Sequence, residues 1–395
     1  MERNKLKDLI KEKAAALLPE IIKIRRHLHA NPELSFREFK TSEFISKILT
    51  ENRIEHKNGI AGTGIVGLIK GSNSTKTIAL RADMDALPIT EQNDVEYKSN
   101  NEGVMHACGH DVHSSCLLGA AIILNELKDN LNVDVKLIFQ PGEEKLPGGA
   151  SLMIKEGVLK NPEPKAIFGQ HVMPFIEAGK VGFRSGMYMA STDEIYVTVK
   201  GKGGHAAMPH LNIDPVLIAA NIIVSLQQIV SRVANPATPS VLSFGKIIAN
   251  GATNVIPNEV KMEGTFRTFD EKWREEAHRR MKQLAENIAK GMGGEADFTI
   301  EKGYPFLINN EELTEKAKSA AIEYLGEENV KDLDIWMAAE DFAFYSQQIP
   351  ACFYRLGTRN EAKGITSSVH TPTFDIDEKA IETGMGLMAW MVVKN

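Results

Sequence analysis

The chain has 395 residues, of which 43% are hydrophobic and 25% charged, a balance typical of folded globular proteins and not of disordered or fibrous ones. Lysine and arginine total 46 and aspartate and glutamate 52, so the formal net charge is −6 and no basic excess is available for binding nucleic acid. At roughly 100–200 residues per domain, this length predicts two or three domains.

The N-terminal residues mix both signs of charge and contain no apolar core of a signal peptide. The longest apolar stretches, such as 216–224, are shorter than the roughly 18 residues that span a membrane. Three cysteines, Cys108, Cys116 and Cys352, are too few for a disulfide framework. We therefore expect a cytoplasmic protein with reduced thiols and no membrane contact.

Residues 3–29 carry apolar side chains at helical spacing, and Pro19 is expected to divide them into two helices. Another helix is predicted at about residues 42–52. Further along, apolar strands are predicted at 77–81, 133–140, 166–170 and 352–356, and a helix at 111–128. Such strands, continuously apolar and separated by helices, predict an α/β domain whose mostly parallel sheet has helices on both faces.

The middle of the chain has a different pattern. Residues 191–200 alternate apolar and polar side chains, as in a half-buried strand. After it the pattern predicts a helix at 214–233, strands at 240–249 and 259–268, a helix at 271–290 and a strand at 296–302. This β-α-β-β-α-β order is typical of ferredoxin-like domains. We therefore expect an inserted α+β domain at 185–297, flanked by segments 1–184 and 298–395 that together form one catalytic domain.

Polar side chains follow three of the predicted strands. They are Asp83 and Asp85 after 77–81, Glu143 and Glu144 after 133–140, and His171 after 166–170. In sheets of this kind the functional site lies beyond the carboxyl ends of the strands, so these residues are expected to share one pocket.

Cys108 and His110 are two residues apart in a loop before a predicted helix, and this spacing lets both side chains face one metal ion. Together with other residues they make five ligands of the type that divalent transition metals prefer: Cys108, His110, Glu144, His171 and His370. Five ligands are many for a single catalytic zinc, which usually has about three, but they fit a two-metal site. Of the two adjacent acids, one can then bind metal while the other handles a proton.

Each of these signals has a structural alternative. Cys108 could be a small buried residue beside a helix-capping Asp111. Glu143 and Glu144 could be a solvated acid pair, and a lone histidine such as His171 is more often structural. The position of these residues after buried strands favours the functional interpretation.

Residues 62–67 match the pattern G-x-G-x-x-G of dinucleotide-binding folds. That site requires the glycines to follow a strand and open a helix, whereas here they lead into a predicted strand. The pattern therefore favours a glycine-rich turn. A nicotinamide-dependent enzyme is an alternative that rests on this motif alone.

Within the inserted region, Arg267 alternates with apolar neighbours on a predicted strand and can bind a carboxylate bidentately. A surface ion pair is the alternative for this residue. His205 and Asn254 belong to the same polar cluster of the inserted region.

Many ordered segments between about residues 25 and 378 resemble one family, the dinuclear-metal aminoacylase/carboxypeptidase family, in its amidohydrolase branch. That branch includes hippurate hydrolases, indole-acetyl-amino-acid hydrolases and N-acetyl-diaminopimelate deacetylases. The matching segments are RRHLHANPEL, LRADMDALPI, MHACGHDVH, FQPGEE, GGASLMIKEGVL, GQHVMP, KGKGGHAAMPH, NVIPNEVKMEGTFRTF, AAEDFAFY and VHTPTFDIDE.

The resemblance assigns roles to individual residues. The metal ligands that it implies are Cys108, His110, Glu144, His171 and His370. It makes Glu143 the general base and Asp85 a supporting carboxylate that orients a ligand. His205, Asn254 and Arg267 match residues of the inserted domain that contact substrate. In relatives with this layout the inserted domain is a lid that also dimerises, and its histidine reaches the partner's active site.

The resemblance implies a metal-dependent amidohydrolase that removes the acyl group from N-acyl amino acids with two divalent metal ions per chain. Zinc or manganese is expected, with cobalt or nickel as alternatives. The expected partners are a small N-acyl amino acid and a second copy of the chain, bound through the inserted domain. Alternatives are a carboxypeptidase or dipeptidase on the same scaffold, and a non-catalytic metal-binding homologue. A non-catalytic homologue would be expected to lack the general base or a metal ligand, but Glu143 and all five ligands are present in this sequence.

Overall fold

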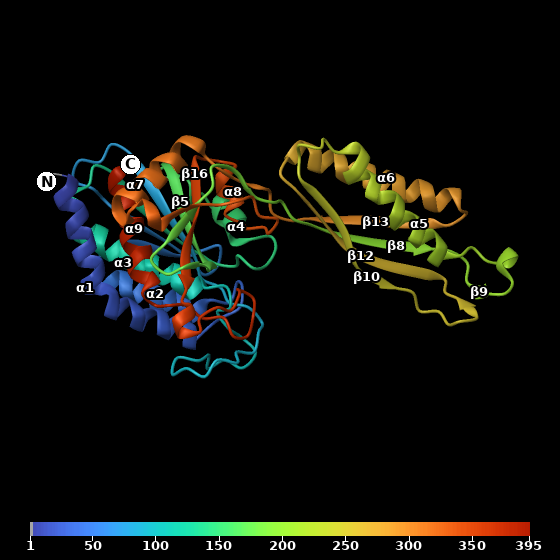
Figure 1. Ribbon diagram of the computed structural model, residues 1–395, viewed down its shortest axis with the longest axis horizontal. Coiled ribbons are helices and arrows are strands. Elements are labelled where there is room, and N and C mark those ends of the chain that lie inside the picture. Colours follow the sequence, from blue (N-terminus) through green and yellow to red (C-terminus); the bar gives the residue numbers. More distant parts are fainter. Residues whose placement is uncertain (1–2) are drawn as a thin grey trace. The chain divides into compact units, whose positions relative to one another are not determined.

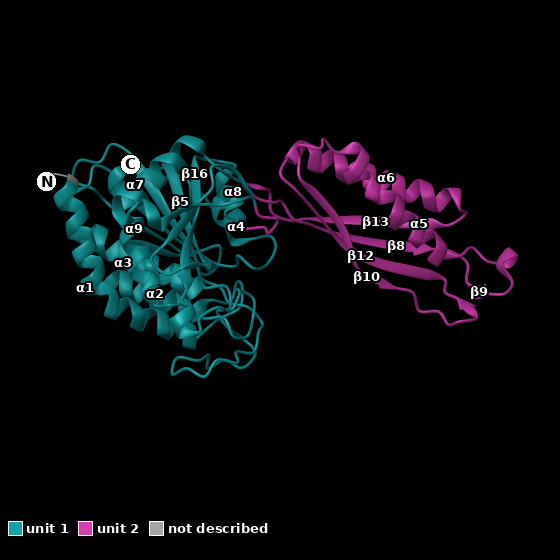
Figure 2. Cartoon of the chain, viewed as in Figure 1, with its two compact units in different colours: residues 1–188, 308–335, 341–395 teal, residues 189–307, 336–340 magenta. Residues whose placement is uncertain are grey.

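The computed structural model describes residues 3–395 (Figure 1). The chain forms two compact units, which Figure 2 shows in different colours. Unit 1 contains the residues up to Tyr188 together with Ile308–Ile335 and Asp341–Asn395. Unit 2 contains Met189–Leu307 and Trp336–Glu340.

Unit 1 is built around an eight-stranded sheet in the order β1-β2-β4-β3-β5-β16-β6-β15. The strands are β1 (Glu55–Ile60), β2 (Gly64–Ile69), β3 (Thr77–Asp83), β4 (Asp134–Gln140), β5 (Pro164–Glu177), β6 (Val181–Phe183), β15 (Val330–Asp332) and β16 (Ala351–Arg359). The central strands β4, β3, β5 and β16 run parallel. Because their carboxyl ends meet at one edge, loops far apart in sequence gather there.

Helices cover both faces of this sheet, as the apolar strands predicted. They are α1 (Arg3–Ala30), α2 (Phe39–Glu51), α3 (His110–Glu126), α4 (Gly149–Lys155), α7 (Glu311–Leu325), α8 (Ala343–Ser346) and α9 (Ala380–Lys394). Figure 1 shows α3 and α9 on one side of β5 and β16, with α4 and α8 on the other. Strand β3 is consequently buried over its whole length.

The expected break at Pro19 is wrong, because α1 continues through this residue as a single helix of 28 residues. A proline inside a helix costs about 3 kcal/mol. Buried apolar residues on both sides of Pro19, including Ile10 and Ile21, offset that cost, since they keep α1 packed against α3 and α9.

Unit 2 contains a four-stranded antiparallel sheet in the order β10-β12-β8-β13. Its elements are β8 (Asp193–Lys200), α5 (Pro215–Gln228), β10 (Ser240–Ile248), β12 (Glu259–Thr268), α6 (Glu271–Gly291) and β13 (Glu295–Lys302). Helices α5 and α6 lie on the same face of the sheet (Figure 1). The β-α-β-β-α-β order and this strand order are those of the predicted ferredoxin-like domain.

The remaining elements are short. The strands are β7 (Gly186–Met189), β9 (Gly204–His205), β11 (Val255–Ile256) and β14 (Leu307–Asn309). Of these, β9 and β11 pair as a two-stranded ribbon within unit 2. Short 3₁₀ turns lie at Lys128–Asn130, Pro209–Leu211, Glu327–Asn329 and Glu361–Lys363, and a π-helical turn at Ile229–Val233 extends α5.

Among the described residues, one helix, Pro215–Val233, is long and apolar enough to cross a membrane by length and composition alone. Its apolar residues are interrupted by polar ones, so the segment contains no apolar run of that length. One face of the helix, with Ile218, Ile222 and Leu226, packs into the hydrophobic core of unit 2. The segment is thus a core helix that leaves much of its other face exposed.

Candidate active site

The five side chains predicted as metal ligands lie together in unit 1, at the carboxyl ends of β3 and β4. Their ligand atoms form two groups, Cys108 with His110 and His171, and Cys108 with Glu144 and His370. Within each group all ligand atoms lie within 4.8 Å of one another. The Cys108 sulfur is 3.4 Å from Nε2 of His171 and 3.3 Å from Nε2 of His370. Cys108 is therefore the member that the two groups share.

The elements of unit 1 explain how these side chains meet. His110 is the first residue of α3, and Glu144 lies in the loop that follows β4. His171 lies inside β5 and not after it, because pairing with β16 carries the strand on to Glu177. His370 is held from its backbone, whose N–H donates to the carbonyl of Ala107 at 2.7 Å.

Hydrogen bonds orient two of the imidazole rings for metal binding. Nδ1 of His110 lies 3.2 Å from a carboxylate oxygen of Asp85, and Nδ1 of His171 lies 2.8 Å from the carbonyl of Val172. Since both partners only accept, each ring carries its proton on Nδ1 when neutral. The Nε2 lone pair of each ring is then directed at the cluster, as in metal-binding histidines.

In the described part of the chain, two buried atoms of the cluster make no hydrogen bond, although one of them, Oε1 of Glu144, lies 3.2 Å from Nε2 of His370. Among the described residues, neither Nε2 of His110 nor Oε1 of Glu144 makes a hydrogen bond. These atoms are 3.9 Å apart, and a carboxylate oxygen of Glu143 also lies 3.9 Å from the same nitrogen. Buried polar atoms are almost always paired in native proteins, so the residues present fit a bound cation.

The electrostatics of the cluster also favour a cation. Burial alone would lower the pKa of His110, but the carboxylates of Asp83 and Asp85 outweigh it and raise that pKa to about 10. Burial, together with the charges of Glu144 and Glu143, holds the pKa of the Cys108 thiol well above its ordinary value. Without a cation, the His110 ring and the Cys108 sulfur therefore hold protons that they must lose in order to bind a metal ion.

His113 and Asp83 form a buried link to the strand that carries His171. The ring nitrogen Nδ1 of His113 lies 2.6 Å from Asp83, and Nε2 accepts the backbone N–H of Val172 at 2.9 Å. Both nitrogens are engaged, so His113 supports the neighbouring His171 and is not itself available as a ligand.

A buried arginine, which the sequence did not single out, extends this network. Arg81 donates to Asp83 at 2.5 Å and to Asp341 at 2.7 Å. The backbone N–H of Asp341 in turn lies 3.4 Å from Oε1 of Glu143. The alternating LRADMD pattern was a signal that Arg81 and Asp83 share a face, but nothing in the sequence indicated that Asp341 would meet them.

Two of the predicted residues in unit 2 are neighbours. His205 pairs with Val255 in the β9–β11 ribbon, and the carbonyl of Asn254 accepts the N–H of Ala206 at 3.0 Å. The N–H of Ala207 donates to Nδ1 of His205 at 3.1 Å. This bond places the proton of the neutral ring on Nε2, so the exposed His205 presents an N–H donor to its surroundings.

Arg267 lies elsewhere in unit 2, at the carboxyl end of β12. It is half-buried in a pocket of about 430 Å³ on the sheet, together with Thr192, Ser243 and Thr265. Within the described part of the chain no carboxylate forms an ion pair with its guanidinium. Burial lowers the pKa of Arg267 from its ordinary value, and the negative charges of Asp193 and Glu194 only partly oppose this shift.

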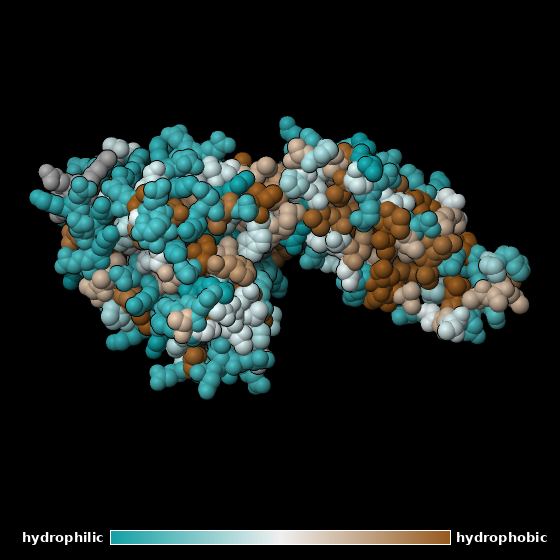
Figure 3. Space-filling view, viewed as in Figure 1, coloured by the Kyte–Doolittle hydropathy of each residue, from teal (hydrophilic) through white to brown (hydrophobic). Residues whose placement is uncertain are grey.

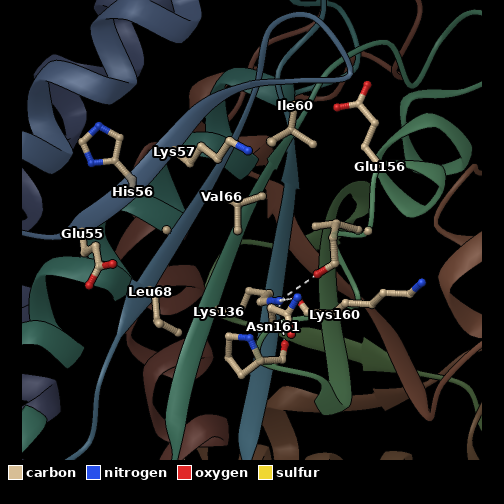
Figure 4. A pocket seen from close by; sticks show the side chains of 14 residues that line it. Glu55, His56, Lys57, Ile60, Val66, Leu68, Lys136, Glu156, Lys160 and Asn161 are labelled. Atoms are coloured by element: carbon tan, nitrogen blue, oxygen red, sulfur yellow. Dashed lines mark hydrogen bonds between the residues drawn. The ribbon is translucent and has the colours of Figure 1, made fainter.

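The pocket in Figure 4 is separate from the predicted site residues. It has a volume of about 300 Å³ and lies against β1 and β2. The Lys136 ammonium beside it donates to the carbonyls of Val158, Lys160 and Pro162 at 2.7–2.8 Å, and burial lowers its pKa to about 8. All three of its protons are used in holding this loop, so Lys136 has a structural role.

Known proteins resemble this chain over nearly its whole length. It is 41% identical to the N-acetyl-L-cysteine deacetylase of Bacillus subtilis, over 93% of this chain and 86% of that protein. It is 38% identical to the thermostable carboxypeptidase 2 of Saccharolobus solfataricus, over 99% and 98% of the two chains. The crystal structure of the Bacillus subtilis YXEP protein, described as a dinuclear metal binding peptidase, superposes with a TM-score of 0.82 at 35% identity, covering 96% of this chain and 98% of that one.

Residues 79–394 match the peptidase family M20/M25/M40, which is most of the chain. The relatives include both deacetylases and peptidases, and both kinds of enzyme hydrolyse amide bonds. The resemblance seen in the sequence motifs is therefore confirmed. The chain belongs to peptidase family M20/M25/M40 and is a hydrolase that acts on amides.

Proposed function

We propose that the protein is a metal-dependent amidohydrolase that cleaves the amide bond of N-acyl amino acids. The observation that carries the proposal is the buried cluster around Cys108, which has metal-binding atoms without hydrogen-bond partners and a second carboxylate, Glu143, beside them. The relative named N-acetyl-L-cysteine deacetylase supports an N-acyl amino acid as the substrate class.

The two groups that share Cys108 would hold two divalent cations. Zinc or manganese suits one thiolate, one carboxylate and three imidazoles, and cobalt or nickel are alternatives. When bound, such cations lower the pKa of water and polarise a carbonyl oxygen. The YXEP protein, described as dinuclear, supports this stoichiometry.

Glu143 is the proposed general base and acid. It lies next to Glu144 in the chain, yet its carboxylate is directed toward the Asp341 N–H, whereas Glu144 approaches His370 at 3.2 Å. Glu143 would take a proton from the attacking water and return it to the leaving nitrogen. Proton transfer and metal binding are thus divided between two adjacent acids.

Arg267 is the proposed anchor for the substrate carboxylate. Its half-buried guanidinium and the hydroxyls around it offer bidentate and single hydrogen bonds to an anion. Asn254 and His205 are proposed to contact the scissile amide, with the N–H of His205 stabilising negative charge on the carbonyl oxygen.

The distances within unit 2 favour a site shared between two chains. Arg267 lies eight residues beyond Glu259, where β12 begins, which corresponds to roughly 26 Å at about 3.3 Å per residue. His205 lies in the β9–β11 ribbon, whose second strand comes just before Glu259 in the chain. Figure 1 shows β9 at the end of unit 2 that is remote from the points where the chain enters and leaves this unit. One small substrate cannot bridge that span, so an active site that uses both residues would take His205 from one chain and Arg267 from the other.

An exposed apolar surface on unit 2 is the proposed dimer interface. Exposed apolar side chains lie on α5 (Val216, Leu217 and Val224) and on the edge strand β10 (Val241, Ile247 and Ile248). Figure 3 shows hydrophobic side chains gathered over α5. Val224 is the most exposed of them, at 74%, and exposed apolar side chains that gather on one helix are typical of an interaction surface. We infer a homodimer that works in the cytoplasm, where the Cys108 thiol stays reduced.

A carboxypeptidase is the second candidate, because the thermostable carboxypeptidase 2 is 38% identical over almost the entire chain. One assay distinguishes the two: metal-stripped protein, reloaded with each metal in turn, is given N-acetyl amino acids and dipeptides of the same C-terminal residue. The proposal expects higher kcat/KM for the N-acetyl substrates. A preference for the dipeptides would establish the carboxypeptidase instead.

A further inference from the structure

Glu38 is a fully buried carboxylate at the start of α2, outside the cluster of metal-binding side chains. One of its oxygens accepts two backbone N–H groups, those of Phe36 and Gly142, each at 2.8 Å. The other oxygen accepts the hydroxyl of Thr63 at 2.7 Å. Three segments that are distant in sequence thus donate to one side chain.

The same three segments are in close contact beside Glu38. A Cβ atom added to Gly142 would lie 2.4 Å from the ring of Phe36, and one added to Gly64 would lie 3.0 Å from the ring of Pro141. The glycine-rich sequence at 62–67 therefore has a structural use: it lets the turn before β2 approach the loop after β4 and bring Thr63 to Glu38. Phe36 adopts φ +63°, a strained value for an aromatic residue, which the contacts around it must hold.

A second carboxylate holds the other side of the same loop. Asp85 accepts the N–H of Glu144 at 3.0 Å and the hydroxyl of Ser35 at 2.6 Å. The backbone is thus held on both sides of Glu143, because Glu38 accepts a hydrogen bond from the N–H of the preceding residue and Asp85 accepts one from the N–H of the following residue. Ser35 and Glu38 are only three residues apart. One short segment therefore supports the loop 141–144 directly through Glu38 and indirectly through the bond from Ser35 to Asp85.

We propose that Glu38 is a positioning residue, whose buried carboxylate fixes the loop 141–144 so that Glu143 is held where it can transfer protons. This inference rests on the proposed role of Glu143 as general base. Asp85 also contacts the predicted metal ligand His110, whereas within the described residues Glu38 makes no hydrogen bond to the side chain of a predicted ligand.

Three substitutions separate this role from simple stabilisation. Glu38→Ala removes all three hydrogen bonds. Glu38→Asp keeps the charge but shortens the side chain by about 1.5 Å, so it cannot reach Gly142 and Thr63 together. Glu38→Gln keeps the shape: its carbonyl oxygen can accept both backbone N–H groups, and the Thr63 hydroxyl can turn to accept from the amide.

Glu33 provides a matched control. Its carboxylate accepts the N–H and the hydroxyl of Thr41 on α2 at 2.9 and 3.0 Å, and it makes no hydrogen bond to the loop 141–144. Glu33→Ala and Glu38→Ala should both lower the melting temperature. Only Glu38→Ala should lower kcat when both are assayed well below that temperature.

The experiment measures kcat, KM, metal content and melting temperature for these variants and for Glu143→Gln with an N-acetyl amino acid. We expect Glu38→Ala and Glu38→Asp to keep two metals and a KM within about threefold of wild type. Their kcat should fall roughly 10- to 100-fold, the size of effect that a misplaced catalytic group produces. Glu38→Gln should recover at least about a third of kcat.

A Glu38→Asp variant with kcat within twofold of wild type overturns the inference, and this test holds even if Glu38→Ala does not fold. So does a loss of kcat that Glu38→Gln fails to rescue. If Glu143→Gln is itself active, the proposed function fails at the base and the inference fails with it. If Glu143→Gln is inactive while Glu38→Asp is unimpaired, only the role of Glu38 is wrong.

Discussion

The sulfur of Cys108 lies 3.3 Å from Nε2 of His370, although 262 residues separate them in the chain. His370 adopts φ +62°, a conformation that non-glycine residues seldom take. Its loop is fixed beside Cys108 by the hydrogen bond from its own N–H to Ala107. Strained backbone held in this way is common at functional sites. The C-terminal loop is thus positioned to complete the cluster.

The two adjacent acids should separate by substitution. Glu143→Gln is expected to retain both metals and lose most turnover, since only the proton shuttle is removed. Glu144→Gln is expected to weaken metal binding itself, since it loses the oxygen nearest His370. Metal analysis after dialysis, paired with kcat, checks both variants. If the two bind metal equally and turn over at similar rates, the division of roles is wrong.

Cys108 and Cys116 offer a matched comparison, because both are buried and free. Cys108→Ser should reduce metal affinity by more than about tenfold and abolish activity, whereas Cys116→Ser should change neither. Since the Cys108 pKa is raised without metal, adding zinc to the stripped wild type should also release protons. Titration in a weak buffer with a pH indicator measures this release. Equal behaviour of the two variants would exclude Cys108 as a ligand.

Oxidation of Cys108 by peroxide should also inactivate the enzyme, because an oxidised sulfur can no longer serve as a thiolate ligand. The Cys116→Ser protein should be equally sensitive. Peroxide-treated protein that regains both full activity and full metal content would contradict the assignment of Cys108.

Arg267 should select for a substrate carboxylate. Arg267→Lys loses the bidentate fork and should lower kcat/KM on N-acetyl amino acids by roughly 10- to 100-fold. On the corresponding amides, wild type and variant should differ little. Arg279→Lys, on the exposed surface of α6, serves as the control for loss of a guanidinium. An equal loss on acid and amide substrates would mean that Arg267 supports the fold of unit 2 instead.

Much of the fold could be predicted because its determinants are local. Apolar runs and alternation locate the strands, and the carboxyl ends of parallel strands bring Glu144 and His171 to one edge. Glu38, Arg81 and Asp341 could not be predicted from the sequence. Their roles arise from contacts between segments more than 100 residues apart, such as Glu38 with Gly142 and Arg81 with Asp341.

The error at Pro19 has a related cause. Helix propensity is a local quantity, whereas α1 is stabilised by its packing on α3 and α9. The sequence of residues 3–29 alone does not indicate that Ile10 and Ile21 are fully buried by other parts of the chain.

Unit 2 should lose stability in acid through Asp193. This buried carboxylate accepts hydrogen bonds from Arg274 at 2.6 and 2.9 Å and lies 2.7 Å from Nε2 of His278. Burial alone would raise its pKa, but these partners outweigh burial and lower it below the ordinary value. Because the folded-state pKa is depressed, the stabilisation is present above the unfolded pKa of about 3.9 and is lost as the pH falls through the folded value.

Asp193→Asn should therefore cost about 3–5 kcal/mol at pH 5, as for a broken buried ion pair, and the difference from wild type should narrow by pH 3. Urea unfolding of metal-free protein at both pH values measures it. Asp297→Asn, which breaks an exposed pair with Lys200, should have little effect at either pH. If the difference in unfolding free energy between wild type and Asp193→Asn is the same at both pH values, the charge of Asp193 does not stabilise unit 2.

The last prediction tests whether His205 acts on the partner's active site. Glu143→Ala and His205→Ala, made separately, should each be nearly inactive. The two variants are then unfolded and refolded together with metal, so that chains mix. In a mixed dimer, the His205→Ala chain keeps its own Glu143 and receives the intact His205 of the other chain, while the second site lacks both.

Random pairing makes about half of the dimers mixed, each with one complete site of two, so activity should recover to roughly a quarter of wild type. If His205 acts within its own chain, every site lacks one of the two residues and nothing recovers. Light scattering and metal analysis of the refolded mixture establish that dimers formed and were loaded. Under those conditions, zero recovery excludes the shared site. A quarter recovery would explain why His205 and Arg267 lie at opposite ends of unit 2, since the two residues of one chain would then complete different active sites.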